Sequence, residues 1–242
     1  MPGLKREATI LPILEDYVTL PYPKPLFFGQ GEGEYQAPFL GYNFISGRFP
    51  IGLNDEQRAS STLLLASFLK ELHAFPVDKA IEKGVPFDSR NLLDLPSRKK
   101  KMFLFLETIS PGLDKEEFAL LKAYLKELKT APIHRKDVFL HGDLHFKNIL
   151  VDKHAHISGV IDWGDMNIGH PACDLSIAFS FLPVTEREKF FHVYGEVDEE
   201  TFLLARFLAV FIPTLILMQA FEDQEERIVA EAKEAIFRAL QD

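Results

Sequence analysis

The sequence predicts an α+β fold with a small first part, which carries one helix and two strands, and a larger, mostly helical second part. Short runs of aromatic and aliphatic residues at 25–28 and 39–45 are the strand candidates of the first part. Two β-branched runs, at 149–152 and 157–161, predict a hairpin in the second part. Hydrophobic residues make up 47% of the 242 positions and include 22 Phe, so the chain can bury a sizeable core.

In the first part, residues 4–14 predict the helix, and the glycine-containing segment 29–35 joins the two strands. This segment resembles a loop that covers phosphates, but Glu32 and Glu34 would repel a triphosphate, so we interpret it as a hairpin turn. A Ser-Gly pair that ends at Gly47 interrupts the second strand and marks the boundary. The two parts are therefore residues 1–47 and 48–242.

The second part is predicted to be helical outside its hairpin. Asn54 or Asp55 can cap the first of its helices, which ends before Pro76. The Pro- and Gly-containing segment 77–96 is expected to be a loop with a short turn. The predicted helices are 54–73, 97–107, 114–128, 185–194, 202–218 and a polar terminal helix from about residue 223.

Composition and charge exclude several classes of protein. A net charge of -9 would repel the phosphate backbone of nucleic acid, so we expect no nucleic acid partner. The apolar segment 202–218 is shorter than a membrane span and is interrupted by Arg206 and Pro213, which predicts a buried, kinked core helix and no membrane contact. Cys173 is the only cysteine and residues 1–5 do not resemble a signal peptide, so a cytoplasmic protein is expected.

The most informative stretch is His141-Gly-Asp-Leu-His-Phe-Lys-Asn148, which is followed by Asp162-Trp-Gly164. An aspartate, a later asparagine and an Asp-aromatic-Gly turn have the spacing of a phosphoryl-transfer site with one base and two magnesium ligands. Mg²⁺ is a hard ion that takes one or two carboxylates plus nucleotide phosphates, which suits Asp162 with the side-chain oxygen of Asn148. Asp143 is left to accept the hydroxyl proton. The predicted hairpin would bring Asn148 and Asp162 together because they stand at its two ends.

Together with Ile161-Asp-Trp-Gly-Asp165 and Gly169-His-Pro-Ala-Cys-Asp-Leu175, this stretch resembles the aminoglycoside phosphotransferase family, relatives of choline kinase. Weaker similarity runs back through residues 69–76 and 38–47. The resemblance implies a two-lobed, protein-kinase-like fold with Mg²⁺ as cofactor. It also implies transfer of the γ-phosphate of ATP or GTP to a hydroxyl of a small, often cationic, molecule such as an antibiotic.

By position, Asp143 matches the family's catalytic base, and Asn148 and Asp162 match its magnesium ligands. His141 matches a structural histidine. Asp174 matches a buried aspartate that braces the catalytic loop, although its position after a proline would also suit a helix N-cap.

The family resemblance also suggests where the nucleotide base binds. We expect the base at the hinge between the lobes, near Asn43, Phe44 and Ile45, with Leu150 and Ile161 as apolar neighbours.

The amino-terminal lobe departs from the family. A kinase-like lobe begins with strands that carry a phosphate-covering loop and a lysine, and that lysine pairs with a glutamate on the next helix. Glu7 would be this glutamate, and no strand candidate precedes it in the sequence given, so a truncated lobe is expected. Either the sequence starts inside the domain or the protein is a naturally shortened member, and as the sequence stands triphosphate affinity should be poor. Lys5 or Lys24 could replace the lysine, but a surface position is the simpler interpretation. The alternative function is therefore a catalytically impaired kinase-like module that binds a nucleotide or a small molecule.

Two residues of the motif region have alternative roles. His145 could approach the acceptor hydroxyl or the γ-phosphate, or it could brace the loop. Asp165 could touch metal or substrate, or it could satisfy backbone groups of its turn. The fragment from Gly142 to His145 also resembles a metal motif of binuclear phosphoesterases, but the further Asp, His and Asn ligands of that chemistry are absent from the sequence.

The carboxy-terminal segment is acidic, with eleven acidic residues against four basic ones from Gly195 onward. An acidic face could attract a cationic acceptor. The spacing of Glu231, Glu234 and Arg238 is instead typical of exposed pairs on a solvated helix, so acidity permits a cationic substrate without requiring one.

Overall fold

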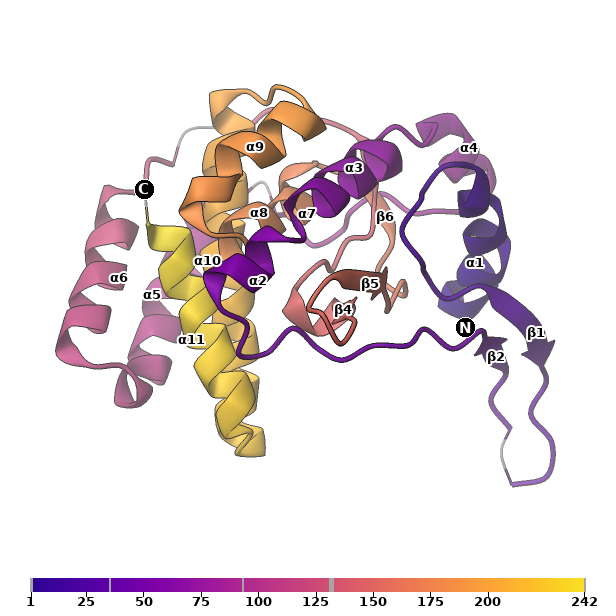
Figure 1. The fold of residues 1–242 in the computed structure, drawn as a ribbon, viewed down its shortest axis with the longest axis horizontal. Helices are drawn as coiled ribbons and strands as arrows, with labels where there is room; N and C mark the ends of the chain where they lie inside the picture. Colours follow the sequence, from indigo (N-terminus) through magenta and orange to yellow (C-terminus); the bar gives the residue numbers. More distant parts are fainter. Residues whose placement is uncertain (1, 35, 93, 131–132, 242) are drawn as a thin grey trace.

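The computed structural model describes residues 2–34, 36–92, 94–130 and 133–241, and it has two unequal parts (Figure 1). Helix α1 and strands β1 and β2 lie at one end with α4 beside α1, a small hairpin lies in the middle, and α5, α6, α10 and α11 lie on the other side. The predicted α+β class is confirmed. In chain order the elements are α1 (Pro2–Ile10), η1 (Leu11–Asp16), β1 (Pro25–Gly29), β2 (Phe39–Tyr42), α2 (Asp55–Ala59), α3 (Thr62–His73), α4 (Val77–Glu82), α5 (Leu95–Ile109), η2 (Ser110–Gly112), α6 (Lys115–Glu127), β3 (Val138–Leu140), η3 (Phe146–Asn148), β4 (Ile149–Val151), β5 (Ile157–Val160), β6 (Asn167–Gly169), α7 (Ala172–Leu175), α8 (Ile177–Ser180), α9 (Val184–Tyr194), α10 (Glu199–Asp223) and α11 (Glu226–Leu240).

The first part has the expected helix and strand pair. Strands β1 and β2 pair antiparallel, as predicted, and α1 packs against both. The expected turn between them includes Tyr35, which lies outside the described residues. The predicted helix 4–14 is divided, because Pro12 has no N–H to donate and the chain continues as the 3₁₀ helix η1. Strand β2 ends at Tyr42, earlier than predicted.

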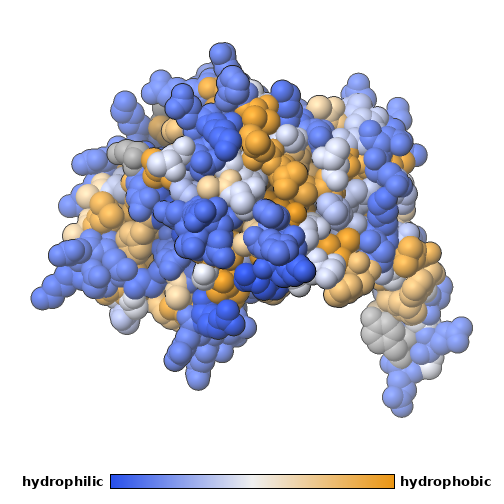
Figure 2. All heavy atoms as spheres, in the orientation of Figure 1, coloured by the Kyte–Doolittle hydropathy of each residue, from blue (hydrophilic) through white to orange (hydrophobic). Residues whose placement is uncertain are grey.

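The surface of the strand pair is apolar and exposed. Leu26, Phe27 and Phe39 are 67, 58 and 42% exposed, and hydrophobic atoms gather over this hairpin at the lower right of Figure 2. The strand pair therefore contributes little buried surface to the core.

Helix α10 is the centre of the second part. It packs against α5, α7, α8 and α11, and its buried side chains include Leu208, Phe211 and Leu217. Within the described residues it is the one helix long and apolar enough to cross a membrane, and 61% of its apolar window is buried inside the structure. The helix continues through Pro213, so the predicted segment 202–218 lies in a core helix that extends beyond both of its expected ends.

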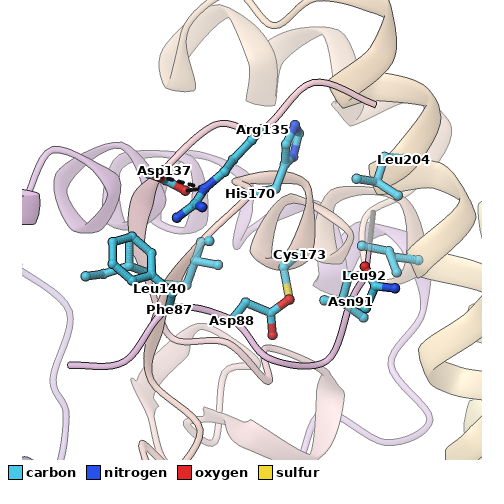
Figure 3. A pocket seen from close by; sticks show the side chains of 13 residues that line it. Phe87, Asp88, Asn91, Leu92, Arg135, Asp137, Leu140, His170, Cys173 and Leu204 are labelled. Carbon is cyan, nitrogen blue, oxygen red and sulfur yellow. Dashed lines mark hydrogen bonds and ion pairs between the residues drawn. The ribbon is translucent and has the colours of Figure 1, made fainter. Parts of the chain in front are cut away.

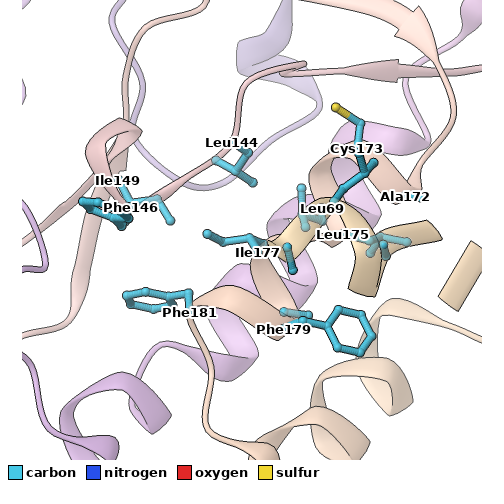
Figure 4. Packing of buried hydrophobic residues seen from close by; sticks show 14 of the residues in the cluster. Leu69, Leu144, Phe146, Ile149, Ala172, Cys173, Leu175, Ile177, Phe179 and Phe181 are labelled. Atoms are coloured by element: carbon cyan, nitrogen blue, oxygen red, sulfur yellow. The ribbon is translucent and has the colours of Figure 1, made fainter. Parts of the chain in front are cut away.

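The loop after β3 is anchored to this core. Along residues 143–148 buried and half-buried positions alternate: Leu144, Phe146 and Asn148 are buried, and Asp143 is half-buried. This alternation turns the polar side chains away from the core. The core side chains around the loop are shown in Figure 4 and include Leu69 of α3, Leu144 and Phe146 of the loop, Ile149 of β4, Ala172, Cys173 and Leu175 of α7, Ile177 and Phe179 of α8, and Phe181.

Several predicted boundaries need correction. The predicted helix 54–73 is divided into α2 and α3; Asn54 caps α2 in a capping box with Gln57. The segment expected to be a loop contains the short helix α4. Strands β3 and β6 pair antiparallel but were not predicted. Each has three residues, which is too short to show the alternation of apolar and polar residues that identifies a strand. The hairpin β4–β5 is confirmed.

The carboxy-terminal helix α11 contributes one residue to a buried ion pair that the sequence alone does not predict. Arg58 of α2 donates to Glu231 of α11 at 2.7 Å, and both side chains are at most 1% exposed. The second oxygen of Glu231 accepts the N–H of Gly52 at 2.9 Å. The interpretation of Glu231 and Arg238 as exposed helical residues was therefore wrong, because both are buried. The predicted helical pair of Arg238 with Glu234 is present at 3.5 Å.

Candidate functional site

The buried carboxylate of Asp174 holds the backbone of the loop that begins at His141. One oxygen accepts the N–H of His141 at 2.8 Å, and the other accepts the N–H of Gly142 at 3.0 Å. Asp174 lies inside α7, whose N-cap position is taken by Pro171. The carboxylate thus satisfies two backbone donors that have no access to water.

His73 and Tyr194 extend this contact and were not expected from the sequence. Nε2 of His73 lies 3.3 Å from Asp174, and Nδ1 lies 2.8 Å from the hydroxyl of Tyr194. Burial alone would raise the pKa of Asp174, but the hydrogen bond and charge of His73, with further help from His141 and the Gly142 N–H, lower it. Asp174 is therefore ionised at neutral pH. Since α3 and α7 are distant in sequence, the only available signal was the weak family similarity at residues 69–76.

His141 connects the loop to the turn that carries Asp162. Its Nε2 donates to the carbonyl of Ile161 at 3.0 Å, and its Nδ1 accepts the N–H of Asp143 at 3.3 Å. Burial lowers the pKa of His141, which outweighs the opposing charge of Asp174, so the ring is neutral. Its edge contact with the buried ring of Trp163, at 4.8 Å between centroids, fixes the turn from the other side.

Gly142 allows a close backbone contact inside the loop. Its φ is +87°, and a Cβ there would lie 2.3 Å from the carbonyl oxygen of Asp165 and 2.4 Å from Nδ2 of Asn167. The same carbonyl of Asp165 accepts a hydrogen bond from Asn167 at 2.8 Å. The loop and the segment after the Asp-Trp-Gly turn are therefore packed backbone to backbone.

Asp143, Asn148 and Asp162 line one recess of about 510 Å³. Asp165 is not among the described residues that line it. The other lining residues are Phe49, His145, Lys147, Ile161, Leu215, Ile216 and Gln219.

Asp143 is surrounded by donors and positive charge. Nε2 of His145 lies 3.3 Å from its carboxylate, and the amide of Asn148 donates to its backbone oxygen at 2.8 Å. Partial burial would raise the pKa of Asp143, but the hydrogen bond and charge of His145, with the charge of Arg90, lower it. The carboxylate can therefore accept a proton at neutral pH. The other ring nitrogen of His145 accepts the N–H of Lys147 at 3.2 Å, so the ring also braces the loop.

The hairpin brings Asn148 and the Asp162 turn together. The backbone oxygen of Asn148 accepts the N–H of Ile161 at 2.9 Å, and Asp162 follows with a left-handed φ of +64°. Because the Asn148 amide nitrogen donates to Asp143, its oxygen is left as an acceptor. The described residues contain no group of three or more His, Cys, Asp or Glu side chains that could hold a metal. The amide oxygen and the Asp162 carboxylate do fit Mg²⁺, whose other ligands would be phosphate and water oxygens.

The predicted hinge residues lie beside the hairpin. The side chain of Asn43 accepts the N–H of Lys24, and Phe44 is 87% exposed. Just beyond Ile45, Ser158 of β5 donates to the carbonyl of Ser46 at 2.8 Å. Of the five residues expected around the base, Ile161 lines the recess; Asn43, Phe44, Ile45 and Leu150 are not among its described lining residues.

Glu7 has a tyrosine partner where a lysine was expected. The hydroxyl of Tyr42 donates to Glu7 at 2.5 Å. Burial raises the pKa of Glu7 and the nearby charge of Asp162 adds to the effect, against the hydrogen bond from Tyr42. Lys24 pairs with Glu15 instead. The lysine that does line the recess is Lys147, and its place in the motif, next to Asn148, was the signal that could have identified it.

A second cavity of about 180 Å³ lies behind the loop (Figure 3). Leu140, Asp88, His170 and Cys173 are among its lining residues. The thiol of Cys173 lies 3.5 Å from the carbonyl oxygen of Gly142, so this cavity borders the loop that carries Asp143.

His170 makes the stability of this region depend on pH. Burial lowers the pKa of His170 to about 4, helped by Lys136 and opposed by Asp198, Glu200 and Asp137. An unfolded histidine takes up a proton below about pH 6.5, whereas the folded one does so only near its lowered pKa, so stability falls as pH drops through this window. We expect a loss of at most about 1.4 kcal/mol per pH unit from this group.

Urea unfolding at pH 7.5, 6.5, 5.5 and 5.0 measures this effect. In a His170→Asn variant the free energy of unfolding should depend less steeply on pH between pH 6.5 and 5.0. Parallel curves for the two proteins would contradict the assignment, since every other titrating group is common to both.

A model of the phosphotransferase enzyme family matches residues 1–208. Viomycin phosphotransferase of Streptomyces vinaceus is 28% identical over 163 residues, which are 64% of this chain and 54% of that protein. The clavilactone A biosynthesis cluster protein Y of Ampulloclitocybe clavipes is 43% identical over 60 residues, which are 22% of this chain and 15% of that protein. The chain thus spans about half or less of the length of these curated relatives.

Solved structures with the same fold match nearly the whole chain. The GDP complex of wild-type aminoglycoside 2'-phosphotransferase-IIIa is 24% identical with a TM-score of 0.65, covering 99% of this chain and 82% of that one. Macrolide 2'-phosphotransferase MphH of Brachybacterium faecium is 17% identical with a TM-score of 0.56, covering 97% of this chain and 79% of that one. The predicted protein-kinase-like fold is confirmed. The model of the phosphotransferase enzyme family matches residues 1–208, which is most of the sequence, from the first helix into α10. This chain therefore belongs to the phosphotransferase enzyme family.

Proposed function

We propose that this protein transfers the γ-phosphate of ATP or GTP to a hydroxyl group of a small molecule. The observation that carries the proposal is the single recess lined by Asp143, Asn148 and Asp162. Membership of a phosphotransferase family supports the reaction class. A related structure that holds both GDP and kanamycin supports a nucleotide donor and a hydroxylated acceptor.

Asp143 acts as the base in this proposal. The acceptor oxygen attacks the γ-phosphorus, the bond from phosphorus to the leaving diphosphate oxygen breaks, and the hydroxyl proton passes to the Asp143 carboxylate. His145 orients that carboxylate from 3.3 Å away. Asp174 and His141 position the loop through the hydrogen bonds they make with its backbone.

The donor nucleotide would bind in the part of the recess that Asn148 and Asp162 line. Asn148 and Asp162 would hold Mg²⁺, which neutralises charge on the phosphate oxygens when bound. Lys147 offers a further positive charge to the phosphates from within the same recess. The base would lie toward the hinge, near Asn43 and Ile161.

A transfer assay tests the proposal. The protein is incubated with magnesium and ATP or GTP, with and without hydroxylated antibiotics, sugars and amino alcohols, and phosphorylated products are detected by phosphorus NMR. Transfer, or slow hydrolysis of the nucleotide by water, supports the proposal. Failure to bind either nucleotide contradicts it, and binding without any turnover favours a non-catalytic binding module.

An Asp162→Ala variant should lose the magnesium dependence of nucleotide binding. Removing a carboxylate ligand leaves Asn148 as the only side-chain oxygen of the proposed metal site, so we expect affinity for a fluorescent ATP analogue in magnesium to fall about tenfold or more. The measurement is a fluorescence titration in magnesium and again in EDTA.

The matched control is Asp78→Ala, which removes an exposed carboxylate from α4. It should bind the nucleotide as the wild type does under both conditions. An Asp162→Ala protein whose affinity still rises on adding magnesium would remove Asp162 from the metal site.

A further inference from the structure

Another recess, of about 380 Å³, adjoins the first at Asp143, and Asp162 is not among its described lining residues. Asp143, His145, Leu215 and Ile216 line both recesses, so a molecule in the second one reaches the proposed base directly. The remaining lining residues are Arg90, Leu92, Arg98, Cys173, Phe211 and Ile212. This is the place for an acceptor, and its walls are apolar with two guanidinium groups.

The positive charge of Arg90 is already used by the protein. Its Nε donates to the carboxylate of Asp88 at 2.8 Å, and its Nη1 donates to the carbonyl of Gly142 at 2.5 Å. These contacts hold the loop that carries Asp143. Arg90 is therefore a structural contact of the loop and has little binding capacity left for a ligand.

Arg98 differs because its charge is not balanced. Its guanidinium donates to the backbone carbonyl of Arg90 and lies 5.1 Å from the ring centre of Phe211. None of the ion pairs in the described part of the chain includes Arg98. A guanidinium has five N–H donors in a rigid plane, and Arg98, which lines the recess, uses one of its nitrogens for a hydrogen bond within the described residues. Its other nitrogen donors remain available to a ligand.

The acidic residues that favoured a cationic acceptor do not reach this recess. Glu231 is buried against Arg58, and none of the described lining residues other than Asp143 is acidic. An ammonium group placed here would meet Arg98, and the one described carboxylate of the recess is Asp143, which the proposed reaction uses for the hydroxyl. A carboxylate would instead receive the paired, charge-assisted hydrogen bonds that guanidinium groups make best.

We infer that the acceptor is a hydroxylated carboxylic acid with an apolar body. Its hydroxyl lies at Asp143, its hydrocarbon portion contacts Leu92 and Phe211, and its carboxylate pairs with Arg98. The inference rests on the proposed phosphotransferase function and adds the chemical class of its acceptor. Stacking on Phe211 holds the guanidinium in place before the substrate arrives, which lowers the entropy cost of binding.

The test uses acceptors in matched sets of three. Each set has one hydroxylated carbon skeleton that ends in a carboxylate, in a primary amide or in an amine; 6-hydroxyhexanoate, 6-hydroxyhexanamide and 6-amino-1-hexanol form one set, and ring-containing sets extend the series to fill the recess. Nucleotide binding and magnesium-dependent hydrolysis are measured first, which establishes the donor half independently of any acceptor. Rates of transfer are then compared for the wild type, Arg98→Gln, Arg98→Lys and the control Arg227→Gln, which removes an exposed arginine on α11.

We expect the carboxylates to be the best acceptors in the wild type. Arg98→Gln should lower kcat/KM for them by about 10- to 100-fold, mostly through KM, while the amides change by less than about threefold. Arg98→Lys should recover part of the loss because the charge returns without the planar fork. Arg227→Gln should match the wild type.

Three outcomes overturn the inference while leaving the phosphotransferase function in place. These are amines or amides that are phosphorylated faster than the carboxylates, an Arg98→Gln variant that slows all three members of a set equally, and intact nucleotide hydrolysis with no carboxylate accepted in any set. A wild-type protein that does not bind the nucleotide is a different outcome, and it contradicts the proposed function itself.

Discussion

Replacing Asp143 with Asn is expected to slow phosphoryl transfer by about 10²- to 10⁴-fold, because an amide cannot accept the acceptor's proton. The fold should persist. Asn148 donates to the backbone oxygen of residue 143, which the substitution keeps, and His145 can still donate to an amide oxygen at the same position. The measurements are kcat for transfer, the affinity for the fluorescent nucleotide and the free energy of unfolding.

The control for Asp143→Asn is Asp78→Asn, which makes the same chemical change at an exposed position on α4. It should leave all three quantities unchanged. A transfer rate within threefold of the wild type in Asp143→Asn would show that another group takes the proton.

The sequence was sufficient for those parts of the site that depend on local spacing. The interval from Asp143 to Asn148 fits one short loop, and the hairpin that follows brings Asn148 back beside Ile161, just before Asp162. The strong helices were also predicted to within a few residues. In both cases the deciding interactions are between residues close together in the chain.

The sequence could not reveal contacts that join distant segments. His73 meets Asp174 across 101 positions, and Arg58 meets Glu231 across 173. No periodicity or motif relates such pairs, so a helix face that is charged in sequence can be buried in the fold. Arg98 was missed for the same reason, since its importance depends on the shape of a recess built by α5, α10 and the loop.

Replacing Asp174 with Ala is expected to affect both stability and catalysis. The substitution leaves the buried N–H groups of His141 and Gly142 without an acceptor, at about 1–3 kcal/mol each, so the free energy of unfolding should fall by roughly 2–6 kcal/mol. In the protein that remains folded, the loop that carries Asp143 loses its support. Misplacement of a reacting group by about 1 Å can cost about 100-fold in rate, and kcat should fall accordingly.

Asp152→Ala is the matched control because the carboxylate of Asp152 also accepts two backbone N–H groups, those of His154 and His156 at 2.8 and 3.0 Å. That turn is exposed, so water replaces the lost acceptor, and we expect a much smaller loss of stability than in Asp174→Ala, with unchanged kcat. If Asp174→Ala does not yield folded protein, Asp174→Asn provides the comparison, since its one remaining oxygen can satisfy only one of the two donors. Equal losses of stability in the Asp174 and Asp152 variants, with normal transfer in both, would mean that the buried carboxylate does not position the loop.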